Sequence, residues 1–135
     1  MLENISVEEF TSPSPLSVEP RAGVQEARKI MQDNGVRHIV VLDKGDIVGI
    51  LSSRDLKFMD IIDEKWSNLL VEDVMVREPF IVDPSTKLED VAFEMSSKKI
   101  GSAVVYSEAS NFLGIFTTTD ALNALIEIAR GDLDK

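Results

Sequence analysis

Residues 49–55 read GILSSRD, and residues 114–120 read GIFTTTD. Both have one form: a glycine, two apolar residues, a hydroxyl residue, two variable residues and an aspartate. Each follows a β-branched run and precedes a helical pattern, which predicts a strand-to-helix junction. Such a junction places hydroxyl groups and free backbone N–H groups at a helix N-terminus, which favours anions and hydrogen-bond acceptors. An aspartate one turn into the helix can accept two hydrogen bonds from a ribose cis-diol.

The same residues also have a purely structural interpretation. Serine, threonine and aspartate are the ordinary residues of a helix N-cap and first turn, so one isolated copy would indicate no more than a cap. Two copies at matched positions, each after the same predicted hairpin, favour a shared function.

The two junctions belong to a duplication that covers most of the chain. A shift of 64 positions aligns Val7-Glu8 with Val71-Glu72 and Pro20 with Pro84, and one inserted residue then aligns Gly49 with Gly114. Repeats at this scale indicate a duplicated supersecondary unit that buries its apolar face against its copy. We expect residues 1–67 to form the first repeat and residues 68–135 the second.

Each repeat predicts the order β-α-β-β-α. An extended segment (16–18 or 80–82) precedes a helix, a hairpin follows, and a second helix begins near Ser53 or Thr118. Thr86 and Glu89 have the spacing of a capping box, and residues 60–70, with Trp66, form the expected connection. The expected fold class is therefore α+β, with two repeats packed about a pseudo-two-fold axis. Six residues of the hairpins are expected in the core: Val40, Val41, Ile50, Val104, Val105 and Ile115.

Composition excludes several classes of function. The chain of 135 residues has a formal net charge of −10 and no cysteine, so disulfides, thiolate metal sites and a cysteine nucleophile are absent. Such an acidic protein repels phosphate backbones and anionic lipid, and we expect neither nucleic acid nor membrane as a partner. No secretory signal and no apolar run of about 18–20 residues is visible, which fits a cytoplasmic location.

No catalytic or metal-binding constellation is visible either. One histidine, His38, makes no zinc site without cysteines unless carboxylates complete it. Neither a nucleophile elbow nor a glycine loop of the Walker type occurs. We therefore expect no catalytic residues, no metal and no enzyme.

Further segments match a known family in order. The hairpins, with residues 36–41 (VRHIVV) and 100–105 (IGSAVV), resemble its second and third strands, and residues 43–50 (DKGDIVGI) resemble its strand connection. The sequence DVM at 73–75, followed by Pro79, resembles the usual start of a repeat. Taken twice over, the set resembles a tandem pair of CBS domains, also called a Bateman module, in a stand-alone protein. That resemblance implies a non-catalytic module that binds AMP, ADP, ATP or an S-adenosyl compound between the repeats and signals to a partner.

The resemblance also implies which residues contact the ligand. Two aspartates would hold the ribose hydroxyls, with a hydroxyl residue of each junction under the sugar or phosphate and basic residues on the phosphate. The backbone of two extended segments would edge the adenine, between apolar walls at positions where many members have proline. The implied residues are Asp55, Asp120, Ser52, Thr117, Arg37, His38, Arg54, Thr119, Leu16, Ser17, Phe80, Ile81, Val40 and Val104.

The two implied sites are not equivalent. The second repeat has Gly101-Ser102 where the first has Arg37-His38, and Thr119 where the first has Arg54. Its nearest cations in sequence are Lys98 and Lys99, which could equally face solvent. We therefore expect two unequal sites.

The last helix carries more apolar residues than one core needs. Leu122, Leu125, Ile126 and Ala129 make one face, and Ala121, Ala124 and Ile128 widen it. The excess suggests a subunit interface, and a two-fold homodimer is the commonest way to cover it.

Three classes of function stay open. The first is an adenine-nucleotide sensor that needs no cofactor and acts on an unidentified effector protein carried on a separate chain. The second is a structural dimerisation module whose cleft holds no ligand, and a sensor of an S-adenosyl compound is a variant of the first. An enzyme is the third and has no support in the residues.

Overall fold

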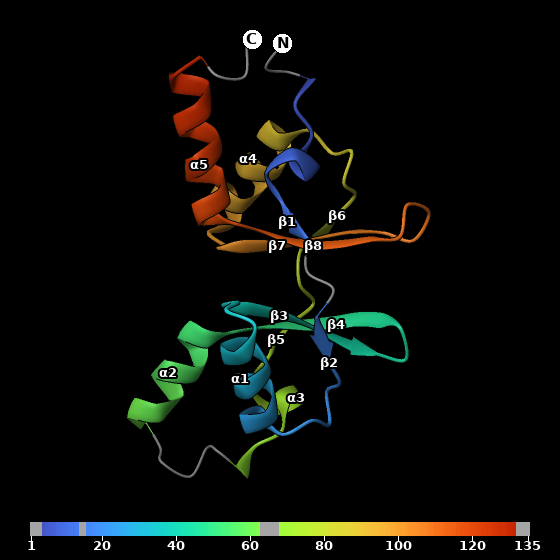
Figure 1. The fold of residues 1–135 in the computed structure, drawn as a ribbon, viewed down its shortest axis with the longest axis vertical. Helices are drawn as coiled ribbons and strands as arrows, with labels where there is room; N and C mark the ends of the chain where they lie inside the picture. Colours follow the sequence, from blue (N-terminus) through green and yellow to red (C-terminus); the bar gives the residue numbers. More distant parts are fainter. Residues whose placement is uncertain (1–3, 14–15, 63–67, 132–135) are drawn as a thin grey trace. The chain divides into compact units, whose positions relative to one another are not determined.

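The computed structural model describes residues 4–13, 16–62 and 68–131, which form two compact units. The first-repeat unit contains residues 16–62 and 68–79, and the second-repeat unit contains residues 4–13 and 80–131. Each unit has a four-stranded sheet with its helices on one face (Figure 1). In each unit the strand that leads into the closing helix ends in a hydroxyl residue, Ser52 or Thr117, and this strand end sets the position of the candidate site.

The elements of each unit follow the order predicted from the sequence. The first-repeat unit contains β2 (Ser17–Val18), α1 (Val24–Asp33), β3 (His38–Asp43), β4 (Asp46–Ser52) and α2 (Ser53–Ile62). The second-repeat unit contains β6 (Ile81–Val82), α4 (Leu88–Lys98), β7 (Ser102–Ser107), β8 (Phe112–Thr117) and α5 (Thr118–Ala129). The prediction of an α+β fold with the order β-α-β-β-α in each repeat is confirmed.

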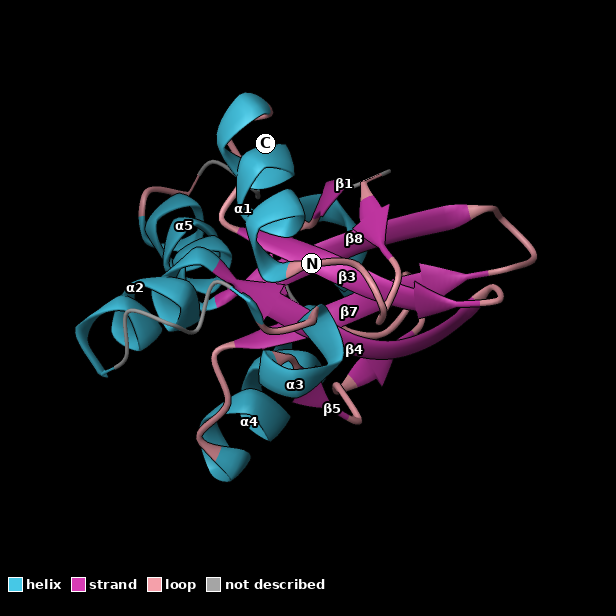
Figure 2. Cartoon of the chain, turned by 90° about the horizontal axis from the view of Figure 1, so that it is seen from below, coloured by secondary structure: helices cyan, strands magenta, loops and turns pink. Residues whose placement is uncertain are grey.

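The sheets are mixed and share one pattern. In the first-repeat unit, β2 pairs in parallel with β3, and β3 pairs antiparallel with β4. In the second-repeat unit, β6 pairs in parallel with β7, and β7 pairs antiparallel with β8. The turn of each hairpin points away from the closing helix, α2 or α5 (Figure 2).

Apolar side chains on the helix-facing side of each sheet make the two cores. In the first-repeat unit, Ile39, Val41 and Leu51 pack with Val24, Ala27 and Met31 of α1. In the second-repeat unit, Ala103, Val105 and Phe116 pack with Leu88, Val91 and Met95 of α4. Because strand side chains alternate between faces, the neighbouring residues of each strand point away from the helices. All six hairpin residues expected to be buried are 6% exposed or less.

The short segment that precedes each repeat in the chain belongs to the unit of the other repeat. The first lead-in segment, residues 7–13, contains the 3-10 helix η2 (Val7–Phe10) and β1 (Ser12–Pro13), and β1 pairs with β8 of the second-repeat unit. The second lead-in segment, residues 71–77, contains α3 (Val71–Val74) and β5 (Val76–Arg77), and β5 pairs with β4 of the first-repeat unit. The packing units therefore differ from the predicted repeats at their starts. The predicted boundary between residues 67 and 68 lies beside residues 63–67, outside the described residues, and stays a prediction.

The junction glycines are required by these lead-in segments. A Cβ on Gly49 would lie 2.5 Å from Met75 Sδ and 3.0 Å from the carbonyl oxygen of Val76. A Cβ on Gly114 would lie 2.6 Å from Thr11 Cγ2 and 2.8 Å from the carbonyl oxygen of Ser12. The first residue of the duplicated motif thus serves strand packing, which explains its place before both junctions.

Two local predictions are wrong. The helix α4 begins at Leu88 with Lys87 as N-cap, and no capping box forms between Thr86 and Glu89. Thr86 belongs to the preceding turn, since its N–H donates to the carbonyl oxygen of Asp83 and its own carbonyl accepts from Val7. The expected connection over 60–70 begins too early, because α2 continues to Ile62. Trp66 lies outside the described residues.

None of the helices in the described ranges is long and apolar enough to cross a membrane.

Candidate functional site

The first-repeat unit presents a row of predicted site residues on the sheet face away from its helices. Val40 of β3 lies opposite Ile50 of β4 and beside Ser17 of β2, and His38 lies opposite Ser52. Val40 is fully buried, Ser17 is exposed, and His38 and Ser52 are half-buried. The register of three strands thus aligns residues 17, 40 and 50 across the sheet, and the hydroxyl residue of the junction, Ser52, ends β4. Leu16 precedes this row and is half-buried against the helix-side core.

The junction after β4 begins the helix α2. The hydroxyl oxygen of Ser52 accepts a hydrogen bond from the backbone N–H of Asp55 at 3.1 Å, as an N-cap residue does. The carboxylate of Asp55 is exposed and makes no hydrogen bond or ion pair with any residue that the structure describes. A carboxylate without a partner in the described ranges is therefore carried by the third residue of α2.

Two arginines flank this junction. The carbonyl oxygen of Arg37 accepts a hydrogen bond from the N–H of Ser53 at 2.8 Å, so the backbone of Arg37 lies against the first residue of α2. Arg54 is the next residue of the helix. Both arginine side chains are exposed, and neither forms an ion pair within the described part of the chain. The junction therefore offers two cations and one carboxylate at one end of α2.

The second-repeat unit repeats the row with different side chains. Val104 of β7 lies opposite Ile115 of β8 and beside Ile81 of β6, and Ser102 lies opposite Thr117. The carbonyl oxygen of Phe80 accepts a hydrogen bond from the N–H of Val104 at 2.8 Å. Val104 is fully buried, whereas Ile81 is 44% exposed.

The junction after β8 is closed by its own hydrogen bonds. Asp120 Oδ2 accepts from the backbone N–H of Thr117 at 2.9 Å and from Thr117 Oγ1 at 3.1 Å, and the N–H of Asp120 reaches Thr117 Oγ1 at 3.4 Å. This is a complete capping box on α5, with an aspartate in the usual place of glutamate. The N–H of Thr118 donates to the carbonyl oxygen of Gly101 at 3.1 Å, and Thr119 is exposed.

Sequence reasoning did not place Lys98. Its Nζ lies 3.0 Å from Glu94 Oε2 and 5.2 Å from the centroid of the Phe80 ring. The spacing of Glu94 and Lys98 by four residues within one helix is the signal that could have indicated this pair. Lys98 is thus held by a carboxylate and an aromatic ring of its own unit.

Neither unit offers the side chains of a metal centre. No group of three or more histidine, aspartate or glutamate side chains in the described ranges is placed to hold an ion. The polar groups at the two junctions can form hydrogen bonds with hydroxyl or anionic groups.

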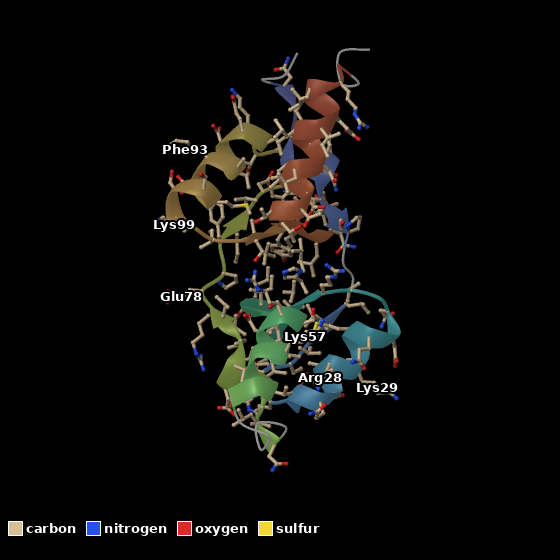
Figure 3. All side chains as sticks on the ribbon, turned by 90° about the vertical axis from the view of Figure 1, so that its left-hand side faces the viewer. Arg28, Lys29, Lys57, Glu78, Phe93 and Lys99 are labelled. Atoms are coloured by element: carbon tan, nitrogen blue, oxygen red, sulfur yellow. The ribbon has the colours of Figure 1, made fainter. Side chains whose placement is uncertain are left out.

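Helix α5 divides its apolar residues between the core and the surface. Ala124 is buried and Ala121 packs against the core. Leu122, Leu125 and Ile126 are 54%, 60% and 45% exposed. The predicted surplus is therefore on the surface of the unit. Phe93 of α4, which sequence reasoning did not single out, also projects outward and is 69% exposed (Figure 3).

Comparison with known proteins gives the same duplication. The sequence pattern of the CBS domain family matches residues 7–59 and again residues 71–127. Inosine-5'-monophosphate dehydrogenase of Korarchaeum cryptofilum is 30% identical over 113 residues, which are 84% of this chain and 23% of the relative. The chain spans less than half the length of the first curated relatives that it matches.

Solved structures share the fold over nearly the whole chain. An uncharacterized conserved protein from Pyrococcus horikoshii is 28% identical with a TM-score of 0.77, and the match covers 92% of this chain and 94% of that one. The structure of CBSX2 in complex with AMP is 26% identical with a TM-score of 0.69, over 92% of this chain and 98% of that one. Two family matches in one chain, on two units of one topology, show that this protein belongs to the CBS domain family and contains a pair of CBS domains.

Proposed function

We propose that this protein is a non-catalytic regulatory module that binds an adenine nucleotide, AMP, ADP or ATP, through its CBS repeats and signals to a partner protein. The observation that carries the proposal is the duplicated junction on the sheet face opposite the helices. A hydroxyl residue and an aspartate begin a helix there twice, beside a buried valine. An AMP complex of a solved relative supports the adenine nucleotide as the ligand.

The site residues fit the parts of such a ligand. Asp55 or Asp120 would accept the ribose hydroxyls, and Ser52 or Thr117 would lie below the sugar or phosphate. The backbone at Leu16-Ser17 in the first repeat, or at Phe80-Ile81 in the second, would edge the adenine, with Val40 or Val104 as an apolar wall. Arg37, His38 and Arg54 would hold the phosphate in the first repeat. In the second repeat, Thr119 stands at the position that matches Arg54. A planar arginine fork suits phosphate oxygens.

The effector of the module is proposed to be a different protein. The relatives include a dehydrogenase in which the matched region is 23% of the protein, so in that relative a similar region is joined to a much larger protein. In a module of this kind, ligand binding shifts the populations of the module's conformations, and the partner protein responds to that shift.

We also propose that two copies associate through α5. The exposed side chains of Leu122, Leu125 and Ile126 lie on one helix face at spacings of three and four residues. A second copy of the same face would cover this stripe symmetrically. A purely structural dimerisation module is the competing function, and it predicts dimers without ligand binding.

Thermal unfolding separates these functions. A ligand that binds only the folded state raises the melting temperature by mass action. We expect AMP, ADP or ATP at millimolar concentration to raise it, with GMP as the control for a purine nucleotide of the wrong base. A melting temperature that responds only to S-adenosylmethionine would assign the S-adenosyl variant. No response to any adenine compound would favour the structural module.

A further inference from the structure

We propose that the module holds a single phosphorylated adenosine per chain, at the first-repeat junction, with the ribose on Asp55 and the phosphate on Arg37 and Arg54. The inference rests on the proposed function and goes beyond it in two respects. It chooses between two junctions of identical sequence form, and it chooses phosphorylated nucleotides over uncharged or cationic adenosine compounds.

The two aspartates differ in the hydrogen bonds that their carboxylates already accept. The carboxylate of Asp55 has no hydrogen-bond or ion-pair partner among the described residues, and its helix cap uses only the Ser52 hydroxyl and the Asp55 N–H. Asp120 Oδ2 already accepts from the N–H and the hydroxyl of Thr117. A cis-diol that binds a carboxylate through both oxygens would have to share Oδ2 with Thr117 or displace it. The sugar therefore meets a free acceptor at Asp55 and a competing cap at Asp120.

The cations are also divided unequally. Arg37 and Arg54 lie at the first junction without ion-pair partners in the described part of the chain. Gly101 and Thr119 stand at the matching positions of the second junction. Every arginine of the chain except Arg130 lies within residues 16–79. In a protein of net charge −10, phosphate binds where these local cations offset the repulsion.

The lysines near the second junction do not replace the arginines. Lys98 is held by Glu94 and by the ring of Phe80, the residue whose backbone would edge an adenine there. A phosphate would have to draw Lys98 away from both. Lys99 follows the helix with a left-handed φ of 57° and projects outward as its C-cap (Figure 3). A cation at that end also offsets the negative end of the helix dipole.

The arginines determine the class of ligand. Phosphate oxygens form charge-assisted hydrogen bonds with guanidinium groups. Adenosine has no such group, and S-adenosylmethionine carries a positive sulfonium next to the ribose, which two arginines would repel. We therefore expect the affinity to fall from AMP to adenosine by at least about tenfold, the loss of one charge-assisted hydrogen bond.

Calorimetric titration of the full chain with AMP, adenosine and S-adenosylmethionine tests the inference. The variants are Asp55→Asn, Asp120→Asn, Arg37→Ala, Arg54→Ala and Lys99→Ala, with Arg21→Ala as a charge-matched control on an exposed arginine outside the junction. We expect one AMP per chain. Asp55→Asn, Arg37→Ala and Arg54→Ala should each weaken AMP binding about tenfold or more, whereas Asp120→Asn, Lys99→Ala and Arg21→Ala should change it by less than about threefold. Arg37→Ala should leave any adenosine binding unchanged.

Separate results overturn the two levels of the proposal. Loss of AMP binding with Asp120→Asn or Lys99→Ala but not with Asp55→Asn overturns the choice of junction and leaves the proposed function standing. Two AMP molecules per chain would overturn the single site, and adenosine that binds as tightly as AMP would overturn the phosphate contacts of the arginines; both results leave the proposed function standing. Absence of binding by every adenine compound to the unmodified protein overturns the proposed function and this inference together. A melting curve of each variant shows that it is folded before it is titrated.

Discussion

Thr11 packs against Gly114 so closely that a Cβ on the glycine would lie 2.6 Å from Thr11 Cγ2. The two residues are more than a hundred positions apart, and the pairing of β1 with β8 brings them together. Thr11 is itself held in place, because its buried hydroxyl donates to the carbonyl oxygen of Val7 at 2.7 Å. The first lead-in segment is thus fixed to the strand that leads into the Thr117–Asp120 junction.

Replacement of Gly114 by alanine should destabilise the protein. The added methyl group would also meet the carbonyl oxygen of Ser12 at 2.8 Å, and a backbone atom cannot move aside as a flexible side chain can. We expect a loss of about 1–3 kcal/mol in the free energy of unfolding, the usual cost of overpacking. Urea denaturation measures it. Gly101→Ala is the matched control, since its methyl group would meet nothing nearer than 3.7 Å. Equal stability of the two variants would contradict the packing.

The two helix caps should differ in strength without ligand. Thr117 both accepts from and donates to Asp120, whereas Ser52 only accepts from the N–H of Asp55. Loss of an N-cap side chain costs about 0.5–2 kcal/mol. We expect Thr117→Ala to lie near the upper end of that range and Ser52→Ala near the lower end. Unfolding free energies would measure this, with hydrogen exchange of the Asp55 and Asp120 amides as a local readout. A larger cost for Ser52→Ala would count against the closed capping box.

The pKa of the Asp83 carboxylate should lie below its ordinary value. Hydrogen bonds from the hydroxyl and the N–H of Ser85 to Asp83 Oδ2 lower its pKa from 3.8. A lowered pKa in the folded state means that the contribution to stability is present above the unfolded value and is lost as the pH falls through the folded value. Carboxyl chemical shifts in an acid titration measure this pKa. Ser85→Ala should raise it toward 3.8, and Ser96→Ala, on exposed α4, should not move it.

Self-association should depend on the exposed face of α5. We expect sedimentation at micromolar concentration to give twice the mass of one chain, because a second copy covers Leu122, Leu125 and Ile126. Leu125→Glu should shift the protein to monomers, since it would place a charge in an apolar contact. Asn123→Glu, an exposed neighbour on the same helix, is the control. A monomer that stays soluble at high concentration would refute the α5 interface.

The sequence predicted the elements that depend on local pattern. The hairpins followed from β-branched runs around turn residues, and the helices α2 and α5 begin at Ser53 and Thr118 as expected. The continuous apolar, β-branched runs also predicted which hairpin residues are buried, including Val40 and Val104. These features depend on contacts between near neighbours in the chain, which periodicity records.

Local sequence pattern did not predict the long-range packing. The strands β1 and β5 have two residues each, too short for any alternating signal, and each pairs with a strand of the other repeat. Thr86 appeared to be a helix cap, but hydrogen bonds to Asp83 and Val7 hold it in a turn. In the candidate site, the duplicated motif predicts both aspartates alike, and their roles stay a prediction. Hydrogen-bond partners distinguish the carboxylate of Asp55, which has none among the described residues, from the capped carboxylate of Asp120.

Calorimetric titration of the purified chain with AMP up to millimolar concentration decides whether the protein binds an adenine nucleotide. We expect a saturable heat of binding that adenine nucleotides produce and GMP does not. A chain that is folded by its melting curve and gives no heat with AMP, ADP or ATP at millimolar concentration would contradict it, and a structural CBS pair without a nucleotide would then describe the protein.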